Sequence, residues 1–146
     1  MKLDKKVEWD SSMSVGEKNI DAQHKKLIGQ INRLIDVISS LSVEIGHVHQ
    51  SGQFLYDYIK EHFAYEEKYM EEHNFPGLEK HKEIHQDFIQ FYKNFKAELK
   101  EEMSSGDFSS VEVEKILEKI KKYLMDWFVN HIKGMDQEYA EYIRAH

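Results

Sequence analysis

Histidines and acidic residues recur along this chain at spacings that suit metal binding. Nine of the 146 residues are histidine. His62 and Glu66 stand four residues apart, as do His81 and His85. On a helix, side chains at i and i+4 point within about 40° of each other, one turn apart, so each pair can direct two ligands to one point. Three further residues complete the candidate set: His24, His131 and Asp136.

Each of these residues also has an ordinary structural interpretation. A single buried histidine such as His24 is more often a hydrogen-bonded core residue than a ligand. One H-x-x-x-H pattern also arises easily by chance in a charged helix. Seven such residues on four converging apolar faces are different, because each buried polar group without a partner costs about 1–3 kcal/mol. We therefore predict a shared metal site.

Other candidate ligands fit the pattern less well. His73 returns to the stripe of Glu66, but it lies about 10 Å further along the helix and close to Pro76. The helical angle turns Glu67 away from the shared point. The remaining three histidines are expected to face solvent, two in a glycine-flanked turn and one at the chain end: His47, His49 and His146.

The number of ligands favours two metal ions that share the carboxylates. Imidazole with carboxylate suits iron, zinc, manganese or copper, and the absence of cysteine removes the preference for structural zinc. If Glu66 and Asp136 bridge two irons together with an oxo or hydroxo group, the iron with three histidines is six-coordinate. The iron with two is five-coordinate and open. Dioxygen could bind there as hydroperoxide if it took one electron from each iron and the proton of the bridging hydroxide. The formal charge of the site would then stay unchanged.

Four amphipathic segments carry these residues, each with apolar side chains at three- and four-residue spacing. The first is expected to begin near Asn19 or Asp21, either of which could cap it. The second should end at 74–77, where Pro and Gly interrupt the pattern. The third runs from about 78 to 103, and the fourth opens at 109–112 with a capping-box pattern.

These segments predict an all-α fold in one domain spanning 1–146. Short connections between amphipathic helices favour an up-down-up-down antiparallel four-helix bundle, which we expect over residues 19–146. Residues 1–18 should form an extended N-terminal arm, with Val7 and Trp9 as its large apolar anchors.

The last helix contains one spacing that does not fit a regular helix. His131 and Asp136 are five residues apart, which places them roughly 140° apart around the axis. A local distortion such as a π-type turn would align them, and Gly134 tolerates such backbone. We predict a distorted or interrupted helix there with Asp136 turned inward; the alternative is that Asp136 faces solvent and Met135 fills the core. The inward stripe of this helix should include Val113, Ile116, Leu117, Ile120, Tyr123, Leu124, Trp127 and Phe128.

The composition narrows the classes of function. Hydrophobic residues make up 40 % and charged residues 32 %, with one proline and seven glycines, as suits helices with solvated outer faces. The net charge of −7 without a basic stripe argues against nucleic acid and against anionic membrane surfaces as partners. The start of the chain lacks the apolar run of a signal peptide and no stretch is long enough to span a bilayer, so a cytoplasmic protein is expected.

The seven candidate ligands occur in the order H…HxxxE…HxxxH…HxxxxD, which resembles the ligand signature of the hemerythrin family. Residues 75–78 resemble the bacterial branch of that family, the bacteriohemerythrins. The resemblance covers nearly the whole chain, from about 7 to 142. Further similar segments are 7–10, 21–27, 62–67 and 127–134.

The resemblance implies a non-haem diiron protein that binds dioxygen reversibly, as a carrier, store or delivery protein rather than an enzyme. By the same similarity, His81, His85 and His131 hold the closed iron, while His24 and His62 hold the open one. The sequence does not identify a protein that accepts the dioxygen.

Five apolar residues are expected to line the open iron, because each lies within four residues of a candidate ligand. An apolar wall excludes water and protons from a bound ligand. Plain core packing is the alternative, and for Trp127 it is the favoured one. Phe128 departs from the family pattern, which usually has an aliphatic residue there. The predicted pocket comprises Leu27, Phe63, Trp127, Phe128 and Ile132.

Two other functions remain open at this stage. A diiron peroxidase or NO-consuming enzyme would use the same ligands, but the sequence offers no obvious proton donor beside them. A module that senses O2 or redox state would need an output partner. A His-Asp phosphohydrolase is disfavoured, because the chain has no adjacent His-Asp pair.

Overall fold

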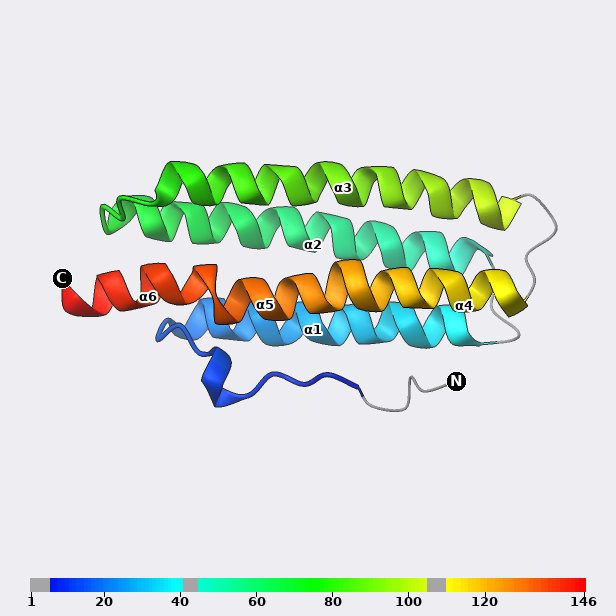
Figure 1. The fold of residues 1–146 in the computed structure, drawn as a ribbon, viewed down its shortest axis with the longest axis horizontal. Coiled ribbons are helices and arrows are strands. Elements are labelled where there is room, and N and C mark those ends of the chain that lie inside the picture. The colour runs from blue at the N-terminus through cyan, green and yellow to red at the C-terminus, as the bar shows by residue number, and fades with distance from the viewer. Residues whose placement is uncertain (1–5, 41–44, 105–109) are drawn as a thin grey trace.

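The computed structural model describes residues 6–40, 45–104 and 110–146, and within these ranges it contains helices and no strand. Four helical rods pack side by side with alternating direction (Figure 1), which confirms the predicted antiparallel four-helix bundle. The first three rods are α1 (Lys18–Ser39), α2 (Ile45–Glu72) and α3 (Leu78–Ser104). The fourth consists of α4 (Ser110–Lys119), η2 (Ile120–Met125), α5 (Asp126–Lys133) and α6 (Met135–Ala145). No helix in the described ranges is long and apolar enough to cross a membrane.

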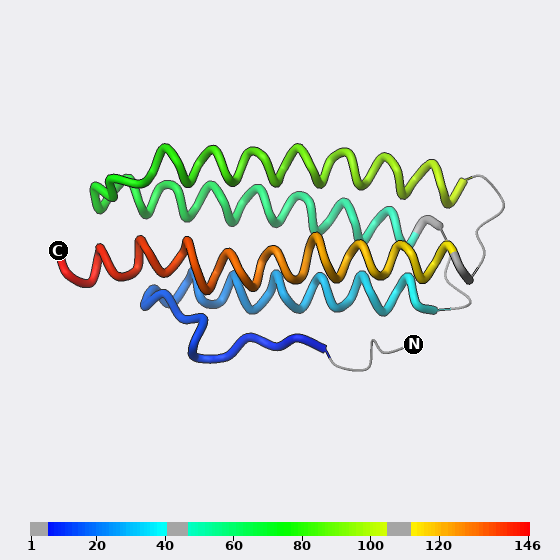
Figure 2. Tube along the Cα trace, viewed as in Figure 1, coloured from blue at the N-terminus to red at the C-terminus, as the bar shows by residue number. Residues whose placement is uncertain are grey.

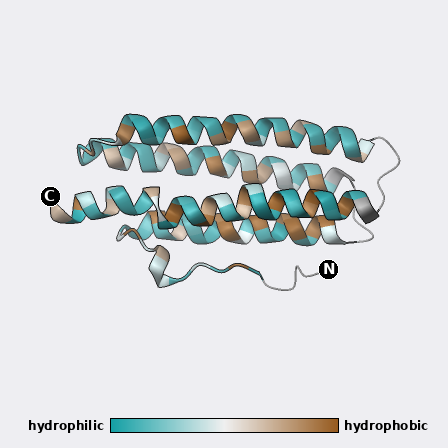
Figure 3. Cartoon of the chain, viewed as in Figure 1, coloured by the Kyte–Doolittle hydropathy of each residue, from teal (hydrophilic) through white to brown (hydrophobic). Residues whose placement is uncertain are grey.

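The core of the bundle is divided into a large apolar cluster and a small one. The large cluster fills most of the length of the bundle and includes Leu34, Leu55, Leu99 and Leu117, each at most 4 % exposed. Figure 3 shows brown, hydrophobic stripes along the same rods, with teal residues on the other faces. The small cluster lies near α6 and contains Val15, Ile20, Met70, Tyr139 and Ala140.

The N-terminal arm runs outside α1, as Figures 1 and 2 show, and includes a short 3-10 turn, η1 (Ser11–Met13). Val7 and Trp9 pack against the large cluster as predicted, but both are only partly buried. Met13 and Val15, which the sequence did not single out, are 2 % and 3 % exposed and anchor the arm more deeply.

The start of α1 differs from the prediction. The residue that caps α1 is Glu17, whose side chain accepts a hydrogen bond from the Asn19 N–H. Asp21 already lies in the first turn and instead accepts hydrogen bonds from the Ser14 hydroxyl and the Val15 N–H. The predicted caps were wrong because Asp21 holds the arm rather than the helix end.

The second connection follows the prediction. The α2–α3 turn contains Asn74 with a φ of 56°, a left-handed conformation that asparagine tolerates better than most residues. Gly77 ends the turn, and a Cβ there would lie 2.7 Å from the Phe75 ring, so a larger residue would force that ring to shift. The first residue of the predicted capping box at 109–112 lies outside the described residues.

A π-helical segment, η2, interrupts the fourth rod before it reaches the polar centre. A π turn contains more residues than an α turn and therefore shifts the phase of the apolar stripe. Leu124 and Met125 point inward, whereas Tyr123, predicted to be inward, is 45 % exposed. The prediction for Tyr123 was wrong because it assumed regular α-helical phase through this segment.

His47 and His49 lie inside α2 rather than in a turn, because the helix begins at Ile45 and continues through Gly52. His47 and the terminal His146 are exposed as predicted, whereas His49 is half-buried. The helix therefore continues through Gly52. The Gly52 carbonyl accepts a hydrogen bond of 2.9 Å from the buried Tyr92 hydroxyl.

Candidate metal centre

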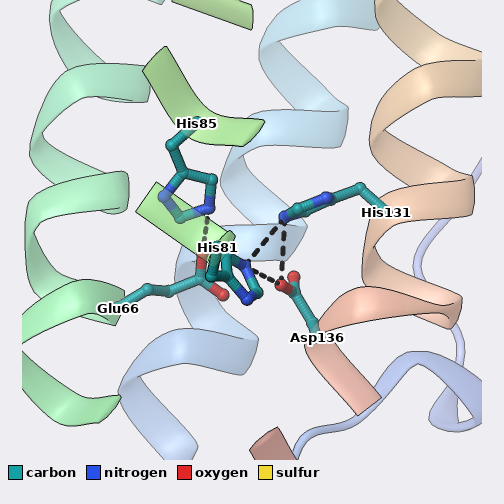
Figure 4. A group of neighbouring side chains, drawn as sticks. All are labelled: Glu66, His81, His85, His131 and Asp136. Carbon is teal, nitrogen blue, oxygen red and sulfur yellow. Dashed lines mark hydrogen bonds and ion pairs between the residues drawn. The ribbon is translucent and has the colours of Figure 1, made fainter. Parts of the chain in front are cut away.

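All seven predicted ligand residues are buried between the two apolar clusters. The most exposed of them, His131, has 6 % of its surface accessible. Four rods contribute, since α1 carries His24, α2 carries His62 and Glu66, α3 carries His81 and His85, and the fourth rod carries His131 and Asp136. Figure 4 shows five of these side chains pointing toward one another.

One group of donors contains three histidines. The Nε2 atoms of His81 and His131 lie 3.1 Å apart, and each lies 3.1 Å from Asp136 Oδ1. His85 Nε2 lies 3.4 Å from Glu66 Oε1 (Figure 4). One ligand atom from each of these five residues falls within 4.8 Å of the others, which is the arrangement of a metal site.

A second group contains two histidines and shares the carboxylates with the first. His62 Nε2 lies 3.2 Å from Glu66 Oε1, and His24 Nε2 lies 3.4 Å from Glu66 Oε2. His24 Nε2 also lies 3.2 Å from Asp136 Oδ2. Each carboxylate therefore faces histidines of both groups.

The backbone breaks where the i+5 spacing required it, which confirms the predicted interruption. Gly134 separates α5 from α6 with φ −108° and ψ −84°, and its N–H donates to Asn130 O. A Cβ on Gly134 would lie only 3.0 Å from that carbonyl oxygen, so a larger residue would displace the chain. The break turns Asp136 inward, where it is fully buried, whereas the π-helical segment lies earlier in the rod.

The donor set fits a cation better than it fits a metal-free core. Several buried atoms have no hydrogen-bond partner: His24 Nε2, His85 Nε2, Glu66 Oε1 and both carboxylate oxygens of Asp136. These atoms face one another, and the contact between two imidazole nitrogens of His81 and His131 can hold at most one hydrogen bond. Lone pairs that converge from nitrogen and oxygen in a buried space are what a first-row metal requires.

Three residues outside the predicted set orient these ligands, and none of the three was predicted to have this role. The His62 Nδ1 lies 2.7 Å from Gln23 Oε1, and the His85 Nδ1 lies 2.8 Å from Glu67 Oε2. The Tyr139 hydroxyl donates to Glu66 Oε2 at 2.5 Å. A partner on the far ring nitrogen fixes the orientation of a metal-binding histidine.

For two of these three residues, the sequence offers a signal in their position next to a predicted ligand. Gln23 and Glu67 are chain neighbours of His24 and Glu66, and each reaches a histidine on an adjacent rod. Glu67 was excluded because its angle does not suit a ligand, but that angle suits a residue that contacts a ligand from outside.

Burial and ion pairing shift the pKa values of the buried histidines in opposite directions. Burial alone would lower the pKa of His24, but its contacts with Asp136 and Glu66 raise that pKa to about 9. The same balance, with Glu66 and Glu67 as partners, raises the pKa of His85 to about 9. The centre thus strongly favours positive charge at these two positions.

The pKa values of the two carboxylates are lowered, whereas those of His24 and His85 are raised. Although burial opposes it, the contacts with His62 hold the pKa of Glu66 well below its usual range, and the contacts with His131 do the same for Asp136. Burial lowers the pKa of His62. Burial and the charge of Glu66 raise the pKa of Tyr139 well above its usual range, so this hydroxyl keeps its proton.

Four of the five predicted pocket residues are fully buried near the centre: Leu27, Phe63, Phe128 and Ile132. The Phe63 ring stacks on His85 with centroids 3.7 Å apart and lies 6.0 Å from the Phe128 ring. Trp127 is half-buried and stacks on His131 at 4.6 Å. The indole therefore packs against the three-histidine group rather than against His24 or His62.

The excluded His73 lies outside the centre. It is exposed, and its Nδ1 donates to Tyr69 O at 2.9 Å, a contact within its own helix.

The chain is similar to known proteins over most of its length. Residues 15–143 match the family model described as the Hemerythrin HHE cation binding domain. A bacteriohemerythrin from Stenotrophomonas maltophilia is 32 % identical over 138 residues, which cover 94 % of this chain and 82 % of that protein. A hemerythrin-like protein from Naegleria gruberi is 34 % identical over 90 % of this chain and 88 % of its own length. A myohemerythrin from Theromyzon tessulatum is 30 % identical, with 90 % and 89 % covered.

Proposed function

Because the chain belongs to the hemerythrin family, we propose that it holds two iron ions at the buried centre and binds dioxygen there reversibly. The observation that carries this proposal is the division of the buried donors into a three-histidine group and a two-histidine group that share Glu66, with Asp136 of the first group also in contact with His24 of the second. A pair of ferrous ions would supply the two electrons that dioxygen binding requires and one open coordination position.

The assignment of ligands follows the grouping of the donors. We propose that His81, His85 and His131 hold one iron, that His24 and His62 hold the other, and that Glu66 and Asp136 serve both. The metal held by fewer histidines would have an open coordination position, and we therefore propose that dioxygen binds on the His24 and His62 side.

The protein's own residues would serve binding rather than turnover. The Tyr139 hydroxyl donates a short hydrogen bond to Glu66 Oε2, and the raised pKa of Tyr139 keeps the proton on this hydroxyl at neutral pH. Phe63 and Phe128 are buried beside the centre and exclude water from it. Dry surroundings slow proton entry. Protons would otherwise allow the bound oxygen to leave in reduced form, and the metal would then remain oxidised.

An absorption spectrum tests the proposal directly. Iron-loaded protein is reduced without air, exposed to oxygen and then flushed with argon. We expect a visible band that appears with oxygen and disappears under argon over repeated cycles. A spectrum that does not respond to oxygen, or a single irreversible oxidation, would contradict reversible binding.

The role of the apolar wall has its own test. Phe128→Leu removes part of a ring that is 1 % exposed and opens space beside the centre. We expect several-fold faster oxygen dissociation and faster permanent oxidation, because water gains access. Phe95→Leu, in the same cluster but two turns of α3 beyond Phe88, provides the control. Equal rates in both variants would remove Phe128 from the pocket.

A further inference from the structure

An open groove between α2 and α3 lies far from the metal centre. Its volume is about 490 Å³, which is within the range of small-molecule sites. The lining residue of α2 that is nearest to the centre in sequence is Tyr56, and about 9 Å of helix axis separates it from His62. Figures 1 and 2 show α2 and α3 side by side along this part of the bundle. The groove is therefore separate from the centre.

The charged side chains that line the groove are cationic. α3 contributes Lys93, Lys96 and Lys100, and no carboxylate is among the lining residues. None of these lysines forms an ion pair with another residue of the described ranges. Three unpaired lysines around one hollow are unexpected in a chain with a net charge of −7.

Lys96 is held in a fixed position at the groove. Its Nζ donates to Gln53 Oε1 at 2.5 Å and lies 4.4 Å from the centre of the Tyr56 ring. Burial and the nearby Lys93 lower the pKa of Lys96, while Asp57 raises it. An ammonium group that is already oriented loses less conformational entropy when a ligand binds.

The remaining wall is apolar, with one imidazole. Val48, Ala97 and Leu99 line the groove beside the lysines. His49, which does not belong to the metal centre, is half-buried here. Burial and the positive charge of Lys100 lower the pKa of His49. A neutral imidazole offers one donor and one acceptor to a polar ligand group.

We propose that this groove binds a small organic polyanion that carries two or more phosphate or carboxylate groups. Lys93 and Lys100 are about 10 Å apart along α3, so the cations match separated negative charges better than a single one. Ammonium groups act as point charges toward phosphate or carboxylate. A bound polyanion would also remove the repulsion among the three lysines, and the apolar wall would contact its carbon skeleton. This proposal does not depend on the chemistry of the metal centre.

Calorimetric titration of the iron-loaded chain tests the proposal. Fructose 1,6-bisphosphate is the phosphate probe and tricarballylate the carboxylate probe, with sodium chloride at matched ionic strength as the reference. We expect saturation at one site per chain with at least one probe. The probe that binds more tightly identifies the ligand chemistry.

Substitutions at Ala97 locate the site. Ala97 is exposed on the groove side of α3, so Ala97→Glu adds a carboxylate there and Ala97→Gln is its uncharged match. We expect Ala97→Glu to weaken binding at least about tenfold, as the loss of a charge-assisted contact does. Ala97→Gln and the remote Lys80→Gln should stay within about twofold, which corresponds to the small effect of an exposed charge.

A second variant keeps the test valid if Ala97→Glu does not fold. Lys96→Gln should weaken binding about tenfold for the same reason, with unchanged thermal unfolding. Failure of both probes to saturate, heats no larger than those of chloride, or equal binding by Lys96→Gln and wild type would overturn the proposal.

Discussion

The interior of the bundle is apolar in one half and rich in ionisable side chains in the other. Around Leu34, Leu55 and Leu117 the interior is wholly apolar, and each such side chain contributes about 1.5–3 kcal/mol through burial alone. Around Glu66 and Asp136 the interior holds five imidazoles and two carboxylates with several atoms lacking hydrogen-bond partners. The first half therefore stabilises itself, whereas the second depends on what its polar groups bind.

Metal removal should produce the largest difference in stability between the two halves. At a metal concentration about 1,000 times the dissociation constant, binding adds about 4 kcal/mol to the free energy of unfolding. We expect that loss in metal-free protein, with faster hydrogen exchange in α5, α6 and residues 62–66. Amides around Leu34 should keep their protection. Uniform loss of protection along the bundle would show that the halves are not independent.

A cavity in the apolar half should produce the converse result. Leu34 is 1 % exposed, and Leu34→Ala should lower the free energy of unfolding by about 3 kcal/mol without changing the metal content. Arg33→Ala, on the exposed face of the same turn, should change it by less than about 0.5 kcal/mol. Denaturant unfolding and metal analysis of both variants check this. Reduced metal content in Leu34→Ala would contradict it.

A smaller effect is expected from the residue that orients His85. Glu67→Gln keeps a hydrogen-bond acceptor near the imidazole Nδ1 but removes its charge. We predict about tenfold weaker metal binding, as is usual for residues that orient metal ligands. Competition with a chelator measures it, and Glu71→Gln, exposed one turn further along α2, is the control. If the two variants bind equally well, Glu67 has no orienting role.

The last prediction concerns the pH dependence of the metal-free protein. The raised pKa values of His24 and His85 stabilise the fold fully below their ordinary value of 6.5, and this contribution is lost as the pH rises toward 9. His62, whose pKa is lowered, opposes this with a contribution that is present above 6.5. The lowered pKa values of Glu66 and Asp136 add stability that is lost only on strong acidification.

Stability of the metal-free chain should therefore decline between about pH 6.5 and pH 9, because His24 and His85 lose their protons in this range while the contribution of His62 changes only below pH 6.5. Urea midpoints across this range check the prediction. A midpoint that stays constant or rises between pH 6.5 and pH 9 would contradict the raised pKa values of His24 and His85.

Residue spacing was sufficient to predict the bundle and the convergence of seven side chains, because apolar periodicity fixes which way His62, Glu66, His81 and His85 face. The misfit between His131 and Asp136 even located the break at Gly134. Spacing on one helix could not reveal contacts between rods.

Three features therefore stayed hidden in the sequence. The contact of Tyr139 with Glu66 depends on how the rods pack. The exposure of Tyr123 depends on a π segment with no glycine or proline to indicate it. The position of His49 inside a helix was obscured by the two glycines beside it, which suggested a turn.

The most direct test of the two-iron centre is a crystallographic anomalous map recorded at the iron absorption edge on iron-loaded protein. We expect two iron peaks per chain, both in contact with Glu66 and Asp136. One should be surrounded by His81, His85 and His131, and the other by His24 and His62. A single peak, or an iron bound away from these seven residues, would contradict it.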